Sequence, residues 1–261
     1  MSKPRVAVHK FSSCDGCQLG ILNLEDELLD LVGAIEIAYF LEATSKIQPG
    51  PYDVALVEGS VSTPHEKKRI HEIREESGVL IAIGACATSG GIQSLRNFVD
   101  HTKLAETVYD HPEYLDYLEK ATPISDHVKV DLEIFGCPIN KYQLLEAVIS
   151  LLQQRTPNLP THSVCLDCKR NGTVCVMVTQ GIPCVGPVTR AGCGAICPAN
   201  GRGCYGCFGP APQAELGAMI PLLQAAEEYP NQTEHLLRNF AGYAPAFRNA
   251  VDAMLEESPK K

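Results

Sequence analysis

The sequence predicts an α/β protein in which a doubly wound parallel sheet is followed by a loop-rich domain that binds metal. Three observations predict this arrangement. Residues 1–155 alternate short apolar runs with helical segments, as βαβ units do. Residues 156–212 lose that periodicity, are rich in Gly and Pro, and contain eight of the twelve cysteines. Residues 213–228 form an amphipathic segment typical of a helix. We therefore expect a flavodoxin-like domain over 1–155, and over 156–261 an iron–sulfur or zinc domain with few regular elements and C-terminal helices.

The strands of the first domain are predicted from short runs rich in β-branched residues, which suit burial on both faces of a parallel sheet. These runs are Arg5–His9, Asp53–Val57, Val79–Ile83 and Val128–Phe135. Helical segments lie between or after them, at Gln18–Leu31, Pro64–Ser77 and Ile139–Leu152. Pro64 suits a first helical position because two hydroxyl residues, Ser62 and Thr63, precede it as candidate caps.

The composition argues against two classes of partner. The 261 residues carry a formal net charge of −9 and the 22 basic residues are scattered, whereas a nucleic-acid surface needs clustered Lys and Arg. No apolar run approaches the roughly 18–20 residues that span a bilayer. The N-terminus leads into Val6-Ala7-Val8 without a signal-peptide core. We therefore expect a soluble, cytoplasmic protein with no nucleic-acid partner and no membrane partner.

Each cysteine of the first domain follows a predicted strand. Cys14 and Cys17 follow the first strand, Cys86 follows the third, and Cys137 follows the fourth. Because ligands of doubly wound sheets gather at the carboxyl ends of the strands, the four thiols are expected to meet at one edge. A flavin mononucleotide site is the rival for this architecture, but the charge of Asp15 in the first loop disfavours a phosphate. Two buried free cysteines beside an incidental C-x-x-C pair are the alternative without a bound group.

The eight cysteines of the second domain are a strong signal for metal. Their spacings are C-x2-C-x6-C-x8-C and, after eight further residues, C-x3-C-x6-C-x2-C. Iron–sulfur clusters and structural zinc sites both take four cysteines, and twelve cysteines make three sets of four. Structural disulfides are rare in a reducing compartment, so a disulfide scaffold is the weaker alternative. Because this stretch has little apolar material, bound metal is expected to supply much of its organisation.

Several motifs resemble those of the small subunits of [NiFe]-hydrogenases. In the first domain these are Cys14-Asp15-Gly16-Cys17, Glu58-Gly59-Ser60-Val61, Gly84-Ala85-Cys86-Ala87-Thr88-Ser89-Gly90-Gly91-Ile92-Gln93 and Gly136-Cys137-Pro138. In the second they are Cys184-Val185-Gly186-Pro187-Val188-Thr189, Cys193, Cys197-Pro198 and Cys204-Tyr205-Gly206-Cys207. The chain is most similar in form to the delta subunits of cytoplasmic NAD(P)-linked hydrogenases and sulfhydrogenases. The gamma subunit of coenzyme-F420-reducing hydrogenases is the close rival.

The resemblance implies three [4Fe–4S] clusters. The proximal cluster would be held by Cys14, Cys17, Cys86 and Cys137. The medial cluster would be held by Cys193, Cys197, Cys204 and Cys207, and the distal cluster by Cys165, Cys168, Cys175 and Cys184. Many relatives have a three-iron medial cluster with a proline at one ligand position, where Cys197 supplies a thiolate here. Many also use a histidine at the distal cluster, so His162 is the alternative to all-cysteine ligation.

The resemblance also bears on residues near the proximal cysteines. Glu58 is expected to hydrogen-bond near the proximal cluster or the partner, or else to cap the following turn. Thr88 is expected to donate to cluster sulfide, or else to be an ordinary turn hydroxyl. Gln18 and Leu19 lie where relatives often have a glutamate, which argues against a proton relay at this position. Gly16 is not the additional cysteine of oxygen-tolerant relatives, so an oxygen-sensitive proximal cluster is expected.

The function implied by the resemblance is electron transfer, with no catalytic residue in this chain. H2 would react at a Ni–Fe site in a large subunit, and a flavin-containing NAD(P)-reductase subunit and an iron–sulfur subunit are the further partners. The final acceptor stays open among NADP, NAD, F420 and polysulfide. A stand-alone iron–sulfur electron carrier and a zinc-stapled structural module are the alternatives from other classes. Quinone-linked respiratory relatives fit less well, because they have adjacent cysteines in the first loop and no eight-cysteine segment.

Overall fold

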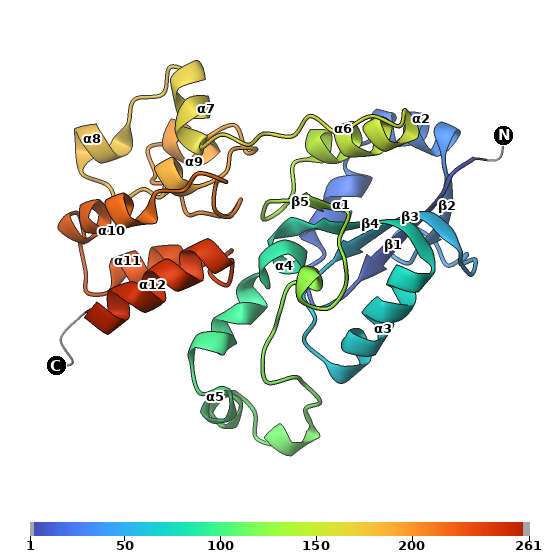
Figure 1. Cartoon of the computed structure of the whole chain (residues 1–261), viewed down its shortest axis with the longest axis horizontal. Coiled ribbons are helices and arrows are strands. Elements are labelled where there is room, and N and C mark those ends of the chain that lie inside the picture. Colours follow the sequence, from blue (N-terminus) through green and yellow to red (C-terminus); the bar gives the residue numbers. More distant parts are fainter. Residues whose placement is uncertain (1–2, 258–261) are drawn as a thin grey trace. The chain divides into compact units, whose positions relative to one another are not determined.

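The computed structural model describes residues 3–257 and divides into two compact units, the first ending at Asn158 and the second beginning at Leu159 (Figure 1). Each unit has its own buried apolar core, as a domain should. No helix within residues 3–257 has the length and apolar character that crossing a bilayer requires.

The first unit is built on a five-stranded sheet whose adjacent strands are all parallel. The strand order is β2-β1-β3-β4-β5, so the direction of winding reverses between β1 and β3. Helix α3 lies on one face of the sheet, and α1 and α6 lie on the other (Figure 1). The strands are β1 (Arg5–Lys10), β2 (Glu36–Phe40), β3 (Tyr52–Glu58), β4 (Ser77–Ile83) and β5 (Leu132–Ile134). The predicted flavodoxin-like doubly wound sheet is confirmed.

Helices of the first unit follow the strands, with short 3-10 turns among them. The α-helices are α1 (Gly16–Leu22), α2 (Asp26–Ala34), α3 (Pro64–Glu75), α4 (Gly84–Ser89), α5 (His101–Val108) and α6 (Lys141–Leu152). The 3-10 turns are η1 (Ile92–Phe98), η2 (Pro112–Tyr114) and η3 (Ile124–Asp126).

Several predicted boundaries in the first unit were wrong. The helix expected over 18–31 is two helices, because the chain breaks where Leu24 turns into the core and Glu25 adopts a positive φ of 54°. Strand β2 was not predicted, since only Ile35 separates it from α2. Strand β5 begins later than expected because Asp131 instead accepts a hydrogen bond from the Leu80 N–H and pairs with Arg74. The helix expected to reach Ser77 ends at Glu75, since Ser77 begins β4.

The start of α3 is fixed by a capping box. The Thr63 hydroxyl accepts a hydrogen bond from the Glu66 N–H at 3.1 Å, and the Glu66 carboxylate accepts one from the Thr63 N–H at 3.0 Å. Pro64 occupies the first helical turn, as predicted. The same carboxylate also accepts from the Ser12 hydroxyl at 2.9 Å, which ties the helix to the loop after β1.

Thr63→Ala is expected to lower the free energy of unfolding by about 1 kcal/mol, because the Glu66 N–H loses its acceptor at the helix end. Urea denaturation followed by circular dichroism measures the change. Thr161→Ala, in an exposed loop, is the control, and should change the stability by less than about 0.5 kcal/mol. Equal losses in the two variants would show that the cap contributes nothing to stability.

The second unit is a group of helices with long connecting loops. Its helices are α7 (Val164–Arg170), α8 (Val176–Gln180), α9 (Ile196–Ala199), α10 (Leu216–Ala225), α11 (Gln232–Leu237) and α12 (Pro245–Glu257), with one 3-10 turn, η4 (Gly186–Val188). The C-terminal helices are as predicted, but α10 is shorter than the expected 213–228. The short helices α7 to α9 were not predicted.

The cysteine-rich segment has more apolar support than its composition indicates. Its buried residues Val164, Val176 and Val185 belong to the same core cluster as Leu223 and Phe247 from the C-terminal helices. The expectation of little apolar material was therefore wrong, because the partners of these valines lie 38 to 83 residues further along the chain. The loops that carry the cysteines are attached to a packed helical base.

Candidate functional site

The four cysteines assigned to the proximal cluster lie at the carboxyl ends of three strands. Cys14 lies in the loop after β1 and Cys17 in α1, while Cys86 lies in α4 and Cys137 follows β5. A hydrogen bond from the Ala85 N–H to the Gly136 carbonyl, 2.7 Å long, joins the loops of the last two. The proximity of the thiols raises the pKa of three of them: Cys86 and Cys137 act on Cys17, and Cys14 acts on Cys86 and Cys137. The topology therefore brings these four residues together.

Two glycines let the backbone approach the thiols. A Cβ atom at Gly84, where φ is +84°, would lie 2.4 Å from the Cys17 Sγ atom. A Cβ atom at Gly91, where φ is +62°, would lie 2.5 Å from the Cys86 Sγ atom. Glycine is required at both positions for conformation and for space.

Burial disfavours the thiolate form of these cysteines. It raises the pKa of Cys17, Cys86 and Cys137 above the ordinary value, to about 12 for Cys86. Thiols gathered at a buried edge become thiolates when a bound cation compensates their charge. The donor set of four sulfurs therefore fits an iron–sulfur cluster. Among residues 3–257, no three His, Cys, Asp or Glu side chains are placed to hold a single metal ion.

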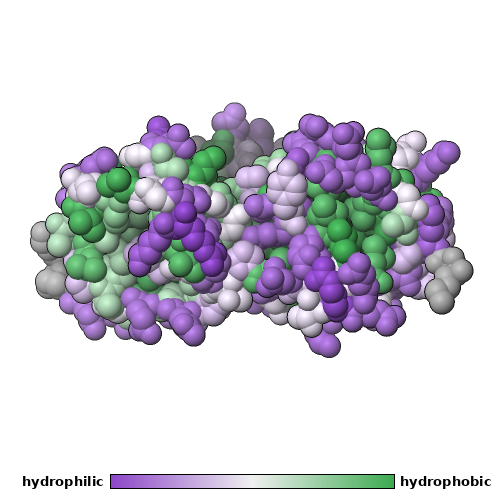
Figure 2. Space-filling view, turned by 90° about the horizontal axis from the view of Figure 1, so that it is seen from above, coloured by the Kyte–Doolittle hydropathy of each residue, from purple (hydrophilic) through white to green (hydrophobic). Residues whose placement is uncertain are grey.

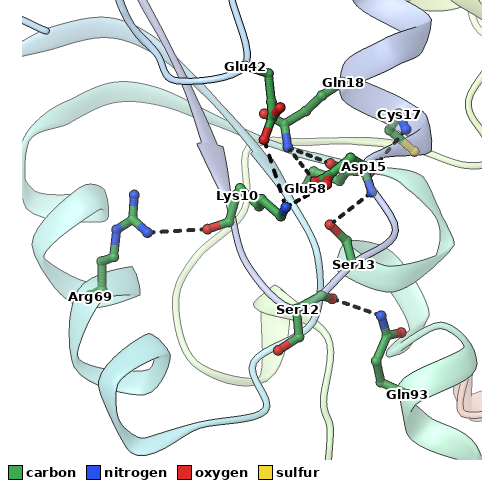
Figure 3. A network of polar contacts seen from close by, with 10 residues as sticks. All are labelled: Lys10, Ser12, Ser13, Asp15, Cys17, Gln18, Glu42, Glu58, Arg69 and Gln93. Carbon is green, nitrogen blue, oxygen red and sulfur yellow. Dashed lines mark hydrogen bonds and ion pairs between the residues drawn. The ribbon is translucent and has the colours of Figure 1, made fainter. Parts of the chain in front are cut away.

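A buried carboxylate fixes the first turn of α1, which carries Cys17 (Figure 3). Glu58, only 1% exposed, accepts a hydrogen bond from the Cys17 N–H at 3.0 Å and one from the Gln18 side-chain amide at 2.7 Å. Burial raises the pKa of Glu58, whereas these two bonds lower it. Glu58 therefore holds the backbone of a cluster-ligand candidate rather than capping the turn that follows β3.

An ion pair holds Asp15, the residue that follows Cys14 and precedes α1 (Figure 3). Asp15 adopts a left-handed conformation with φ of 67°, which is unfavourable for a non-glycine residue. Its carboxylate pairs with the Lys10 Nζ atom at 2.5 Å and accepts from the Gln18 side-chain amide at 3.3 Å. The bond to Asp15 raises the pKa of Lys10. Charge pairing thus fixes the loop in a conformation that the backbone alone disfavours.

Residues to which the sequence assigned no hydrogen bond complete this network. The Gln93 side-chain amide donates to the Ser12 carbonyl at 3.0 Å (Figure 3). Gln93 also hydrogen-bonds the Cys86 thiol, which lowers the pKa of that thiol against the effect of burial. Gln18 and Gln93 have partners that are distant in sequence, Glu58 and Ser12, and the bond of Lys10 to Asp15 follows no recognisable spacing. Of the two roles expected for Thr88, the contact seen in the structure is that of a turn hydroxyl, which donates to the Gly84 carbonyl one turn earlier at 3.0 Å.

In the second unit, the four cysteines assigned to the distal cluster line one cavity of about 110 Å³. Cys165 and Cys168 reach it from α7, Cys175 from the start of α8, and Cys184 from the loop before η4. Burial and the neighbouring thiols raise the pKa of Cys165 to about 11, and Lys169 lowers it. The cavity is otherwise lined mostly by apolar and small side chains, so its donors are the four sulfurs.

The four cysteines assigned to the medial cluster form two pairs of neighbouring thiols, Cys193 with Cys197 and Cys204 with Cys207. Cys193 lies near enough to Cys197, and Cys207 near enough to Cys204, to raise the partner's pKa. The Cys204 N–H donates to the Cys184 Sγ atom at 3.1 Å, which ties this set to the cavity. All twelve cysteines of the chain are free thiols in the structure.

His162 is engaged outside the cavity. Its Nε2 atom lies 3.0 Å from the Asp167 carboxylate, and its carbonyl accepts a hydrogen bond from the Ala191 N–H. It is not among the residues that line the cavity of the four cysteines. The lining of the cavity therefore contains the four cysteines assigned to the distal cluster and not His162.

Comparison with known proteins supports a common origin for the first unit and for most of the chain. The family model of the NADH ubiquinone oxidoreductase 20 kDa subunit matches residues 14–151. The sulfhydrogenase 2 delta subunit of Pyrococcus furiosus is 39% identical over 221 residues, which are 84% of this chain and 92% of that protein. The chain is a hydrogenase small subunit of this family. As such, it is part of an oxidoreductase complex.

Further relatives extend the match beyond the first unit. A subunit of the vhu F420-non-reducing hydrogenase of Methanocaldococcus jannaschii is 37% identical, over 82% of this small subunit and 85% of its own length. The iron-sulfur subunit of an F420-non-reducing hydrogenase of Archaeoglobus profundus is 25% identical, over 76% of the chain and 80% of its own length. A chain of the crystal structure of an NAD+-reducing [NiFe]-hydrogenase is 27% identical, with a TM-score of 0.56, and the match covers 60% of this small subunit and 96% of that chain.

Proposed function

We propose that this small subunit carries electrons through three [4Fe–4S] clusters between the Ni–Fe site of a large subunit and a flavin-containing NAD(P)-reductase partner, reached through an iron–sulfur subunit. The proximal cluster would be held by Cys14, Cys17, Cys86 and Cys137, the medial one by Cys193, Cys197, Cys204 and Cys207, and the distal one by Cys165, Cys168, Cys175 and Cys184. When bound, each cluster would take up and release one electron at a time.

The observation that carries the proposal is the convergence of four cysteines from three strand ends at one edge of the sheet. The chain's own residues then have positional tasks. Glu58 and Gln18 hold the loop of Cys17, Lys10 holds Asp15, and Gln93 links the Cys86 loop to the loop after β1. Such surrounding hydrogen bonds orient cluster ligands and tune cluster potentials.

Exposed apolar side chains next to these cysteines favour a subunit over a stand-alone electron carrier. Leu19 follows Cys17 in α1 and is 52% exposed. Ile92 and Leu95 lie in η1, after the helix of Cys86, and Tyr142 lies in the first turn of α6, after Cys137. Large apolar side chains that surround a site on several elements mark a surface that a partner covers. We assign this surface to the large subunit, since electrons would enter at the cluster it surrounds.

The proposal also includes the electron acceptor. The relative from M. jannaschii is named an F420-non-reducing hydrogenase, and the structural relative an NAD+-reducing one. These names favour a nicotinamide-linked acceptor chain over direct reduction of coenzyme F420. We place the chain in the cytoplasm, where both the nicotinamide pool and reduced thiols are found.

The proposal is tested by isolating the complex anaerobically through a tag on this chain. We expect a larger nickel-containing chain to co-purify and the complex to reduce a viologen dye with H2. A Leu19→Glu, Leu95→Glu double variant should lose the nickel chain and keep its iron, since it changes only the apolar surface. Leu255→Glu, on α12, is the matched control and should keep both. Isolation of the wild-type chain alone, with all its iron, would instead indicate a stand-alone carrier.

A further inference from the structure

The side chain of Gln93 lies between two segments that carry cysteines of the proximal set. Its amide donates to the carbonyl of Ser12, two residues before Cys14, at 3.0 Å (Figure 3). It also lies next to Cys86, because a Cβ atom added at Gly91 would come within 2.8 Å of the Gln93 Oε1 atom and within 2.5 Å of the Cys86 Sγ atom. The Gln93 amide therefore lies beside a sulfur that is assigned to the proximal cluster.

The Ser12 carbonyl fixes which end of the Gln93 amide makes these contacts. A carbonyl oxygen only accepts hydrogen bonds, so the NH2 group must face it, and this group has a second hydrogen to donate. Gln93 is half-buried among protein groups, whereas the hydrophilic side chains on the face seen in Figure 2 can bond to water. Gln93 hydrogen-bonds the Cys86 thiol and lowers its pKa, as a donor does for a group that becomes negative. The second hydrogen is therefore available to the Cys86 sulfur.

The bond from Gln93 to Ser12 is duplicated by a backbone bond. The Ser12 carbonyl also accepts from the Ser60 N–H, at 2.9 Å. If the Gln93 amide is removed, this carbonyl keeps a partner and the loop after β1 keeps its attachment to the residues that follow β3. The fold therefore does not depend on the Gln93 amide at this point, and the contact with the Cys86 sulfur is the interaction that its loss would remove.

We propose that Gln93 is a positioning residue that raises the reduction potential of the proximal cluster by donating an N–H···S hydrogen bond to Cys86. The proposal rests on the proposed function and adds a side chain that sets the potential of one cluster. One electron from the large subunit increases the negative charge on the cysteine sulfurs, and a donor at Cys86 stabilises that charge. The same electron then leaves for the medial cluster, so no covalent bond changes and no proton moves.

Redox potentiometry of the anaerobically purified complex, followed by electron paramagnetic resonance, tests the proposal. Gln93→Leu keeps the approximate size of the side chain and removes the donor. It is expected to make reduction of the proximal cluster about tenfold less favourable, which is about 59 mV for one electron. Gln93→Glu should lower the potential further, because a carboxylate repels the added electron. Gln153→Leu, at an exposed position at the end of α6, is the matched control and should leave the potentials of all three clusters unchanged.

A 15N label in the side-chain amides of glutamine tests the same contact in the wild-type complex, whether or not a variant loses iron. The reduced proximal cluster should show a coupling to 15N in pulsed electron paramagnetic resonance. Absence of this coupling, or its persistence in a Gln93→Leu variant that retains iron, would overturn the proposal. An unchanged or raised potential in Gln93→Leu would also overturn it. A wild-type complex without any proximal cluster signal would instead contradict the proposed function, and with it this role of Gln93.

Discussion

Cys17→Ala is expected to remove the proximal cluster and to stop H2-dependent electron transfer by the complex. Cys17 is 7% exposed, and its N–H is fixed by the Glu58 carboxylate. Loss of its sulfur leaves three thiols of a set that the fold holds in place, and a cluster of this type takes four protein ligands. Iron analysis should show a loss of about four irons from about twelve per chain. The rate of viologen reduction by H2 should fall to background.

Cys175→Ala is the matched variant for this prediction. Cys175 is exposed and lines the cavity of the second unit, so its loss should remove the distal cluster and leave the proximal one. Electron paramagnetic resonance of the reduced proteins distinguishes the two cases, because different signals disappear. Full iron content in Cys17→Ala, or loss of the same signal in both variants, would contradict the assignment of cysteines to separate clusters.

Gly84→Ala is expected to destabilise the first unit by about 3 kcal/mol and to prevent assembly of the proximal site. Alanine at a positive φ costs roughly 1–2 kcal/mol on its own. The added Cβ would also lie 2.4 Å from the Cys17 Sγ atom, so the Cys17 thiol must move. Chemical denaturation measures the stability, and iron content measures the site.

Gly33→Ala is the control, since a Cβ atom there meets nothing within 4 Å in the exposed part of α2. It should leave the iron content unchanged and stabilise the protein by up to about 1 kcal/mol, because alanine restricts the unfolded chain. Gly84→Ala with normal stability and a normal proximal signal would show that the close approach seen here is not required.

The sheet and the meeting of the proximal cysteines were predictable because both follow from local patterns. Runs such as Val79–Ile83 identify strands, and parallel topology then places the residues after each strand at one edge. The four cysteines that line the cavity of the second unit were grouped from their spacing and from the family resemblance. These signals are carried by residues that are close in sequence or belong to a motif.

Of the polar network around the proximal cysteines, the sequence indicated Glu58 but not the residues that bond to it. Gln18 and Glu58 are 40 residues apart, and Gln93 and Ser12 are 81 apart, so no periodicity connects them. The sequence left two roles open for Thr88, because a hydroxyl in a short helix can also bond to the preceding turn, here the Gly84 carbonyl. Side-chain contacts of this kind depend on tertiary packing, which the sequence pattern does not specify.

The central claim is that the twelve cysteines hold three iron–sulfur clusters. Analysis of iron, acid-labile sulfide and zinc in the anaerobically purified chain, combined with Mössbauer spectroscopy, tests it most directly. We expect about twelve irons and about twelve sulfides per chain, all in [4Fe–4S] form, and no stoichiometric zinc. A colourless preparation that contains zinc, or sulfurs joined in disulfides, would contradict the claim and with it the proposed path of electrons.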